Sequence, residues 1–278
     1  MVKIFFTILL FFTFSFSNET KREDLLIEKI QTFVDASVYK ENKAYIDILF
    51  SPKSDYYTQD RIDSVKVIGT LKDNGLLKLF FKNPKELKLS FKTSGSPLLF
   101  VKIMGDTLRN IGYYRYVTRE SNLNSSEFTW SISLVSEYAT DPQILQKELH
   151  KNGCTIVDLQ RNSPTDWTYT VDMRDGHLSL DLLKAGEEVV LKRSLYAHWM
   201  NASKIKTLEI KSSSRNDWYP YIAYYDSSLH LLEVIKKDKK TTNIILTLPK
   251  YTQYIKISDI YTLKNIRDSL VLNPVDLR

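Results

Sequence analysis

The sequence predicts an α+β fold in which tandem ferredoxin-like (βαββ) α/β plait units are followed by an antiparallel β-sandwich. Three observations favour this class. Segments with helical periodicity alternate with pairs of strand-like segments between residues 41 and 175. Each of these helical segments ends at a glycine, the residue that most easily adopts the left-handed conformation of a helix C-terminus. From Glu187 onward, only short strand-like segments separated by turns are found.

Composition and charge narrow the class further. The 278 residues are enough for one large or two ordinary domains. With 8 Gly and 8 Pro beside 17 Tyr and 13 Phe, the chain is neither collagen-like nor disordered, and it has little glycine for phosphate-binding loops. The formal charge of +6 is spread along the chain without a basic arm, which disfavours nucleic acid as a partner. The single cysteine, Cys154, excludes an intramolecular disulfide and is expected to be a buried small apolar residue.

Residues 1–17 have the layout of a cleaved secretory signal peptide. Lys3 gives a basic start, an apolar segment runs from residue 4 to residue 14, and Ser15-Phe16-Ser17 is a small-x-small cleavage site. The apolar segment is shorter than the roughly 20 residues of a membrane-spanning helix, and no later segment is long and apolar enough to span. We therefore expect a bacterial protein exported to the periplasm, with surface display or secretion as the alternatives.

The mature chain is expected to begin with a helix over residues 18–40, on which Leu26 and Ile30 share one face. A first α/β plait over residues 41–122 and a second βαββ unit over residues 123–175 are expected to follow. The expected strands are residues 44–50, 76–81, 87–91, 113–118, 128–134, 154–159 and 167–173, and the expected helices are residues 60–73, 97–110 and 142–152. Asn83-Pro84 predicts a turn between the second and third of these strands.

Residues 176–278 are expected to form the β-sandwich. Strand-like segments recur at residues 189–191, 208–210, 219–225, 229–235, 243–248, 254–257 and 270–272. Turns are expected at residues 226–228 and 237–241. Several short strands at regular spacing are typical of an antiparallel sandwich.

Part of this region resembles a known family. Residues 224–232 read as a strand, an aromatic residue, Asp226 and a pair of leucines, and they are followed by Leu-Thr-Leu-Pro at residues 246–249 and Tyr-Ile-Lys-Ile at residues 254–257. Over residues 183–272 this pattern resembles the bacterial pre-peptidase C-terminal (PPC-like) β-sandwich family. Lys250 stands where the family pattern has glycine. The resemblance implies an exported accessory domain for binding or stabilisation, and it carries over no catalytic residue.

The sequence contains few residues that match the motifs of catalytic or metal-binding sites. The sequence has no Walker A loop, GxGxxG, HExxH, GxSxG or CxxC. Ser37 and Lys40 match the Ser-x-x-Lys pattern, but the companion Lys-Thr-Gly element is missing. Asp172, Asp175 and His177 offer oxygen and imidazole ligands for a divalent cation, although an interdomain turn explains the same residues. The sequence therefore predicts no catalytic residue, no metal and no cofactor.

Trp218, Tyr219, Tyr221, Tyr224 and Tyr225 are the candidate ligand-binding residues. On a strand, Tyr219, Tyr221 and Tyr225 share one face, and Trp218 and Tyr224 point to the other. Exposed aromatic side chains on a sandwich suit sugar stacking or protein contact. Packing in the core accounts for the same pattern without a function, and the sequence leaves both interpretations open.

These observations favour an exported, non-enzymatic envelope protein that binds an envelope protein partner as a scaffold or assembly accessory. Small α/β units present sheet edges and helix grooves, which are common sites of protein binding. A glycan- or cell-wall-binding protein that uses the sandwich aromatics is the alternative, with polysaccharide as the ligand. The third hypothesis is that the protein is an enzyme. Only two groups of residues support it, Ser37 with Lys40 and the Asp172–His177 group.

Overall fold

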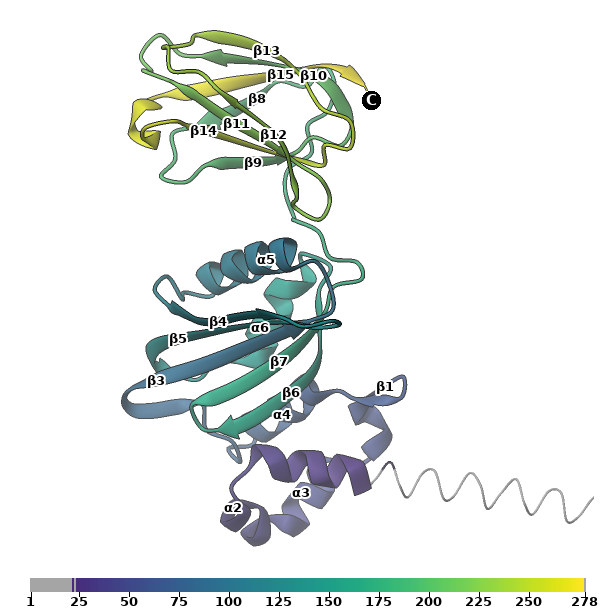
Figure 1. The fold of residues 1–278 in the computed structure, drawn as a ribbon. Helices are drawn as coiled ribbons and strands as arrows, with labels where there is room; N and C mark the ends of the chain where they lie inside the picture. Colours follow the sequence, from purple (N-terminus) through teal and green to yellow (C-terminus); the bar gives the residue numbers. More distant parts are fainter. Residues whose placement is uncertain (1–21, 23, 278) are drawn as a thin grey trace, which may run out of the picture. The chain divides into compact units, whose positions relative to one another are not determined.

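A computed structural model describes residues 22 and 24–277 (Figure 1). The chain divides into two compact units between Gly176 and His177. The expected signal peptide, residues 1–17, lies outside the described residues, as does the first part of the expected helix over residues 18–40. Within the described part of the chain, no helix is long and apolar enough to cross a membrane.

The first unit begins with short helices. Residues 24–33 are helical, and two short helices follow, α2 (Ala36–Glu41) and α3 (Lys43–Leu49). Next come the 3-10 helix η1 (Lys53–Tyr56) and a two-stranded ribbon formed by β1 (Tyr57–Thr58) and β2 (Arg61–Ile62). The prediction of a strand over residues 44–50 is therefore wrong. Ile46 and Phe50 are buried four residues apart, whereas Tyr45 and Ile48 are exposed. The apolar residues thus follow helical spacing rather than alternation.

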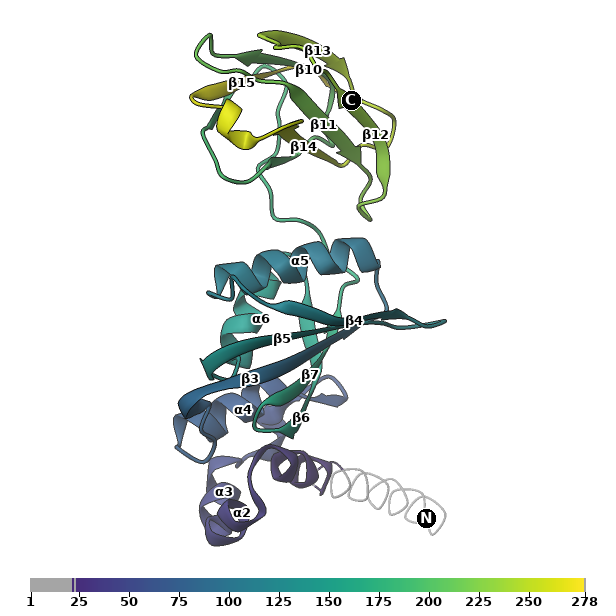
Figure 2. The ribbon, with the colours of Figure 1, turned by 60° about the vertical axis from the view of Figure 1, so that its left-hand side comes forward.

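A five-stranded sheet forms the centre of the first unit, and its strands can be followed in Figures 1 and 2. Its strands, in the order β4-β5-β3-β7-β6, are Val117–Leu123, Phe128–Tyr138, Phe80–Thr93, Asp166–Asp172 and Thr155–Ser163. Neighbouring strands are antiparallel except β3 and β7, which are parallel. The boundary expected between residues 122 and 123 falls inside β4, which is hydrogen-bonded to β5. The two expected plait units therefore share one sheet within one compact unit.

β3 is one continuous strand, where the sequence predicted two strands joined at Asn83-Pro84. Its pairing with β5 passes from Phe80 directly to Lys85, so residues 81–84 form an irregularity in the register. Proline has no N–H to donate, and a bulge is one of the few places where a strand accepts it. Pro84 thus marks a bulge in this strand and not its end.

Three helices cover one face of the sheet, α4 (Ser64–Asp73), α5 (Pro97–Asn110) and α6 (Pro142–His150) (Figure 1). α6 contacts both α4 and α5. Pro97 and Pro142 predict the starts of α5 and α6. The Asp141 carboxylate caps α6, because it accepts the backbone N–H of Gln143 at 2.9 Å. Gly75, directly after α4, has a φ of 74°, the conformation that its place at the helix end predicts.

The second unit consists of two four-stranded antiparallel sheets. One sheet, in the order β13-β10-β15-β8, comprises Asn243–Thr247, Ile205–Ser212, Ser269–Leu277 and Val189–Lys192; the other, β12-β11-β14-β9, comprises Leu231–Lys236, Pro220–Tyr225, Tyr254–Asp259 and His198–Asn201. The 3-10 helix η2 (Leu263–Asn265) precedes β15. Buried side chains from both sheets, among them Ile210 and Leu272 facing Trp218 and Ile222, form one core. The unit is therefore a β-sandwich.

The predicted α+β class with antiparallel sheets is confirmed, and seven of the sandwich strands lie where the sequence predicts them. The sequence did not predict β9. This strand is short, lies at the edge of its sheet, and alternates the buried Met200 with the partly exposed Trp199. Four residues give too little alternation to be recognised in a sequence.

Candidate functional site

Two of the five candidate ligand-binding residues, Trp218 and Tyr224, belong to the sandwich core. Both side chains are fully buried and lie in the core cluster. The indole N–H of Trp218 donates to the backbone carbonyl of Ser258 at 2.8 Å. Burial raises the pKa of Tyr224, and its hydroxyl has no hydrogen-bond partner among the described residues. A site that includes these two side chains is therefore excluded, because no ligand reaches them.

The other three candidates, Tyr219, Tyr221 and Tyr225, are partly exposed on the outer side of the same sheet. Tyr221 and Tyr225 alternate with buried residues along β11, as the two-residue period of a strand requires. Ala223 lies between them, and its cross-strand neighbour on β14 is Lys256. The sequence therefore predicts correctly which tyrosines share a face.

Trp199, from β9, extends this aromatic surface. Its ring centroid is 5.0 Å from that of Tyr225. Lys256 is opposite Trp199 in the register, and its Nζ is 5.8 Å from the ring centroids of both Trp199 and Tyr221. Lys236, on β12, is opposite Tyr221, and its Nζ is 5.4 Å from that ring. We call these five residues the aromatic–lysine face.

The two lysines carry positive charge that no acidic side chain neutralises. The contacts of the Lys236 and Lys256 ammonium groups are with aromatic rings, and neither forms an ion pair within residues 22 and 24–277. The outer side of the opposite sheet differs, because Glu209 there pairs with Lys211 at 3.1 Å and accepts a hydrogen bond from Asn243 at 3.1 Å. Lys236 and Lys256 thus give the aromatic–lysine face a positive charge.

The aromatic surface has a closed end and an open end. At the closed end, Tyr254 is opposite Tyr225 but is buried, and its hydroxyl accepts the backbone N–H of Leu178 at 3.0 Å. At the other end, the rings of Tyr219 and Tyr261 pack edge to face with centroids 5.1 Å apart. Tyr261 is exposed. The row of exposed aromatic rings therefore continues beyond the aromatic–lysine face at one end only, the end that carries Tyr219 and Tyr261.

This arrangement can bind sugars without any catalytic group. Flat aromatic side chains on a rigid strand offer area for the apolar faces of sugar rings at little cost in conformational entropy. Ammonium groups beside the rings can pair with carboxylates on the same polymer. A sugar chain that carries negative charge would find both kinds of contact on this surface.

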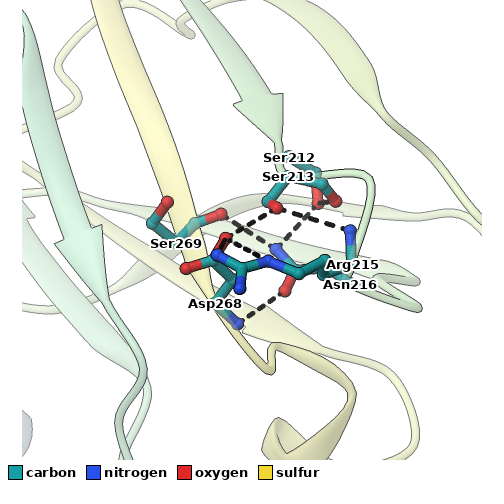
Figure 3. Close-up of polar contacts among 6 residues, drawn as sticks. All are labelled: Ser212, Ser213, Arg215, Asn216, Asp268 and Ser269. Carbon is teal, nitrogen blue, oxygen red and sulfur yellow. Dashed lines mark hydrogen bonds and ion pairs between the residues drawn. The ribbon is translucent and has the colours of Figure 1, made fainter.

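A polar cluster at one end of the sandwich is structural (Figure 3). It joins the loop after β10 to the start of β15 through Ser212, Ser213, Arg215, Asn216, Asp268 and Ser269. The Asp268 carboxylate accepts the Ser213 hydroxyl at 2.7 Å and the Arg215 guanidinium at 2.6 Å. Both contacts hold the pKa of Asp268 below its usual range. Such a carboxylate is a weak general base, so the cluster fixes the loops and does not activate Ser213.

The remaining sequence candidates gain no chemical role. Cys154 is buried, as predicted, and burial raises the pKa of its thiol to about 11. Ser37 and Lys40 are exposed on the short helix α2. Asp172 pairs with Arg174 at 2.7 Å, and this contact lowers the pKa of Asp172. Within residues 22 and 24–277, no three His, Cys, Asp or Glu side chains are grouped to hold a metal ion.

The first unit contains a groove that sequence reasoning missed. It has a volume of about 760 Å³ and lies at the start of β4, beside β5. Arg109 from α5, Arg119 from β4 and Glu86 from β3 line it, together with residues 113–117, which include Arg115. We call it the arginine groove. Its residues are spread over three strands, a helix and a loop, so no local sequence pattern marks it.

No family model, curated protein or solved structure matches this chain. The resemblance of residues 183–272 to the pre-peptidase C-terminal family therefore stays a prediction, and the functional proposals rest on the geometry of the two units.

Proposed function

We propose that this chain is an exported, non-enzymatic protein of the bacterial cell envelope whose sandwich binds an acidic polysaccharide. The observation that carries the proposal is the aromatic–lysine face. Three partly exposed rings, those of Trp199, Tyr221 and Tyr225, share one sheet surface with Lys236 and Lys256. Uronate residues match this surface, because each combines an apolar ring face with a carboxylate.

The expected binding is weak for one sugar unit and stronger for a polymer. Aromatic contacts contribute about 0.5–1.5 kcal/mol each beyond buried area. Three such rings and the ammonium groups of Lys236 and Lys256 correspond to a dissociation constant of roughly millimolar for a short oligosaccharide. A polysaccharide presents many equivalent sites, so that retention on the polymer exceeds this single-site affinity.

The test is affinity electrophoresis of the mature chain in gels that contain polygalacturonate or, for comparison, neutral amylose. We expect retardation by polygalacturonate, loss of most of it in Trp199→Ala, and partial loss in Lys256→Gln. Tyr251→Ala is a matched control, because Tyr251 is 71% exposed and has Lys250 over its ring at 4.9 Å, outside the face.

Two results would contradict the proposal. Equal retardation by amylose would show that charge has no part in recognition. Unchanged retardation in Trp199→Ala, or the same loss in Tyr251→Ala as in Trp199→Ala, would show that the aromatic–lysine face is not the site.

Protein binding is the second function we propose, and it is the role that the sequence favours for ferredoxin-like plait units. The specific observation for it is the arginine groove beside β5. Affinity purification of the tagged mature chain from native envelopes tests this function. We expect a stoichiometric protein partner with the wild-type chain and loss of that partner with Arg115→Glu; recovery of no partner with the wild type would contradict protein binding.

A further inference from the structure

The outer edge of β5 is left without a strand neighbour over its last residues. Its pairing with β4 ends at Ser133, which is opposite Val117. Its pairing with β3 on the other side continues to Tyr138, which is opposite Phe80. Within the part of the chain that the structure describes, the segment from Leu134 to Tyr138 therefore has a strand on one side only. An exposed strand edge of this kind pairs readily with an added chain.

The arginine groove lies along this open edge. Gly105 and Arg109 of α5 line it on the helix side of the sheet, and Glu86 and Arg119 line it from the strands. Tyr113 also lines a second groove of about 490 Å³, which reaches Phe80, Tyr138 and Ile144. The two grooves flank the same segment of β5, and Tyr113 lies between them with its hydroxyl bonded to the Thr140 hydroxyl at 3.2 Å, so an extended chain that fills both grooves displaces this ring.

Exposed apolar side chains line the path of such a chain. Val135 is 72% exposed, and Val117, Tyr114, Phe80 and Tyr138 are also exposed. The rings of Phe80 and Tyr138 pack against each other with centroids 5.2 Å apart. Val135 and Tyr138 are three residues apart on β5 and lie on opposite faces of the sheet, so the apolar side chains of an added strand, which alternate, would cover one of these two faces.

The charge of the groove selects an acidic occupant. Arg119 donates to Glu86 at 2.7 Å and to the Ser133 hydroxyl at 2.7 Å. Arg109 pairs with Asp106 at 3.3 Å, a carboxylate that Lys102 also binds, at 2.7 Å. The third arginine, Arg115, lies in the loop before β4 and has no carboxylate partner within residues 22 and 24–277. Three arginines and one carboxylate, that of Glu86, thus line the groove, while Glu137 is exposed in the segment of β5 itself.

We propose that an extended, acidic segment of a partner protein adds as a strand to the outer edge of β5 between Leu134 and Tyr138. Its carboxylates bind the arginines of the groove, with Arg115 as the main contact, and its apolar side chains cover the rings around Tyr138. This inference rests on the second proposed function, protein binding, and names the partner's chemistry and its mode of attachment.

The test uses the mature chain and labelled peptides of roughly nine residues in which valine alternates with glutamate or, for comparison, with lysine. Fluorescence anisotropy measures binding. We expect the glutamate peptide to bind, the lysine peptide to bind at least about tenfold more weakly, and Arg115→Glu to weaken the glutamate peptide by about tenfold or more. Lys239→Glu, the same charge change at an exposed turn of the sandwich, is expected to have no effect.

A second variant removes space instead of charge. Gly105 lies in the middle of α5 with no strained backbone angle, and the nearest atom to an added Cβ is the Tyr116 hydroxyl at 3.4 Å. Gly105→Leu therefore extends into the groove while replacing glycine with a better helix former. We expect it to weaken the glutamate peptide without unfolding the unit.

Hydrogen exchange distinguishes an added strand from a peptide held by charge alone. Strand addition predicts slower exchange of backbone amides within residues 134–138 when the glutamate peptide is bound. Unchanged exchange there, equal binding of the two peptides, or full binding by Arg115→Glu would overturn the inference. If native envelopes yield a partner that Arg115→Glu loses while the glutamate peptide does not bind, protein binding stands and strand addition fails; if neither binds, both fail.

Discussion

Asn216 tests how the sandwich holds its loops together. We predict that Asn216→Ala destabilises the C-terminal unit by about 2–4 kcal/mol. The side chain is 1% exposed. Its Nδ2 donates to the carbonyl of Ser269 at 2.8 Å and to the hydroxyl of Ser212 at 3.1 Å, and its Oδ1 accepts the N–H of Asp268 at 2.8 Å (Figure 3).

The magnitude follows from what alanine leaves unpaired. The N–H of Asp268 loses its acceptor, at a cost of about 1–3 kcal/mol for a buried donor. The Ser269 carbonyl keeps one partner, because the N–H of Ser213 donates to it at 3.3 Å. The Ser212 hydroxyl keeps the carbonyl of Ser213 at 3.5 Å. The loss at these two groups therefore adds only about 1 kcal/mol.

Hydrogen exchange of the β10 and β15 amides in the whole mature chain measures this change, because it reports on the sandwich without assuming that both units unfold together. Arg215→Ala is the control. Its guanidinium is exposed and pairs with Asp268 from the outside, so its removal is expected to cost less than about 1 kcal/mol. If Asn216→Ala costs no more than Arg215→Ala, the buried hydrogen bonds do not hold these loops.

Three further predictions concern pH, reactivity and helix capping. Burial lowers the pKa of His198 below its ordinary 6.5. Below pH 6.5 the unfolded chain therefore binds more protons than the folded chain, so that the free energy of unfolding is highest above pH 6.5 and falls as the pH drops below 6.5. His198→Phe should therefore reduce the loss of sandwich stability between about pH 7 and about pH 5, and an unchanged acid dependence in exchange experiments would refute this role. Cys154, with its pKa raised to about 11, should react with iodoacetamide at pH 8 only after unfolding, whereas rapid alkylation of the folded chain would show that it is accessible. Asp141→Ala should destabilise the first unit by about 1–2 kcal/mol, because it removes the cap on the Gln143 N–H and the ion pair with Lys72 at 2.9 Å; Asp141→Asn, which keeps an oxygen for the cap, should cost less in urea unfolding.

Local backbone chemistry explains why much of the fold could be predicted. Proline at the first turn and glycine after the last turn restrict only a few residues, and their effect does not depend on distant contacts. α5 and α6 begin at the prolines that signal them, at Pro97 and Pro142. The same reasoning failed at Pro84, because a proline in a bulge and a proline in a turn satisfy the same local requirement. Only the pairing of β3 with β5 distinguishes the two cases.

The candidate site was predictable only in part, for a similar reason. The two-residue period of a strand groups Tyr221 with Tyr225 and separates both from Tyr224. It does not show which group enters the core, since that depends on the opposite sheet. Trp199 and Lys256 are 57 residues apart in the sequence and become neighbours only through the pairing of β9 with β14. The aromatic–lysine face is therefore a product of sheet assembly.

Tryptophan fluorescence tests the acidic-polysaccharide proposal most directly. Trp130, Trp167 and Trp218 are buried, and Trp199 is partly exposed on the aromatic–lysine face. Titration of the mature chain with oligogalacturonate should produce a saturable change in emission that Trp199→Phe abolishes and neutral amylose oligosaccharides do not produce. A flat titration, or the same change in Trp199→Phe, would contradict the proposal that this face binds the sugar.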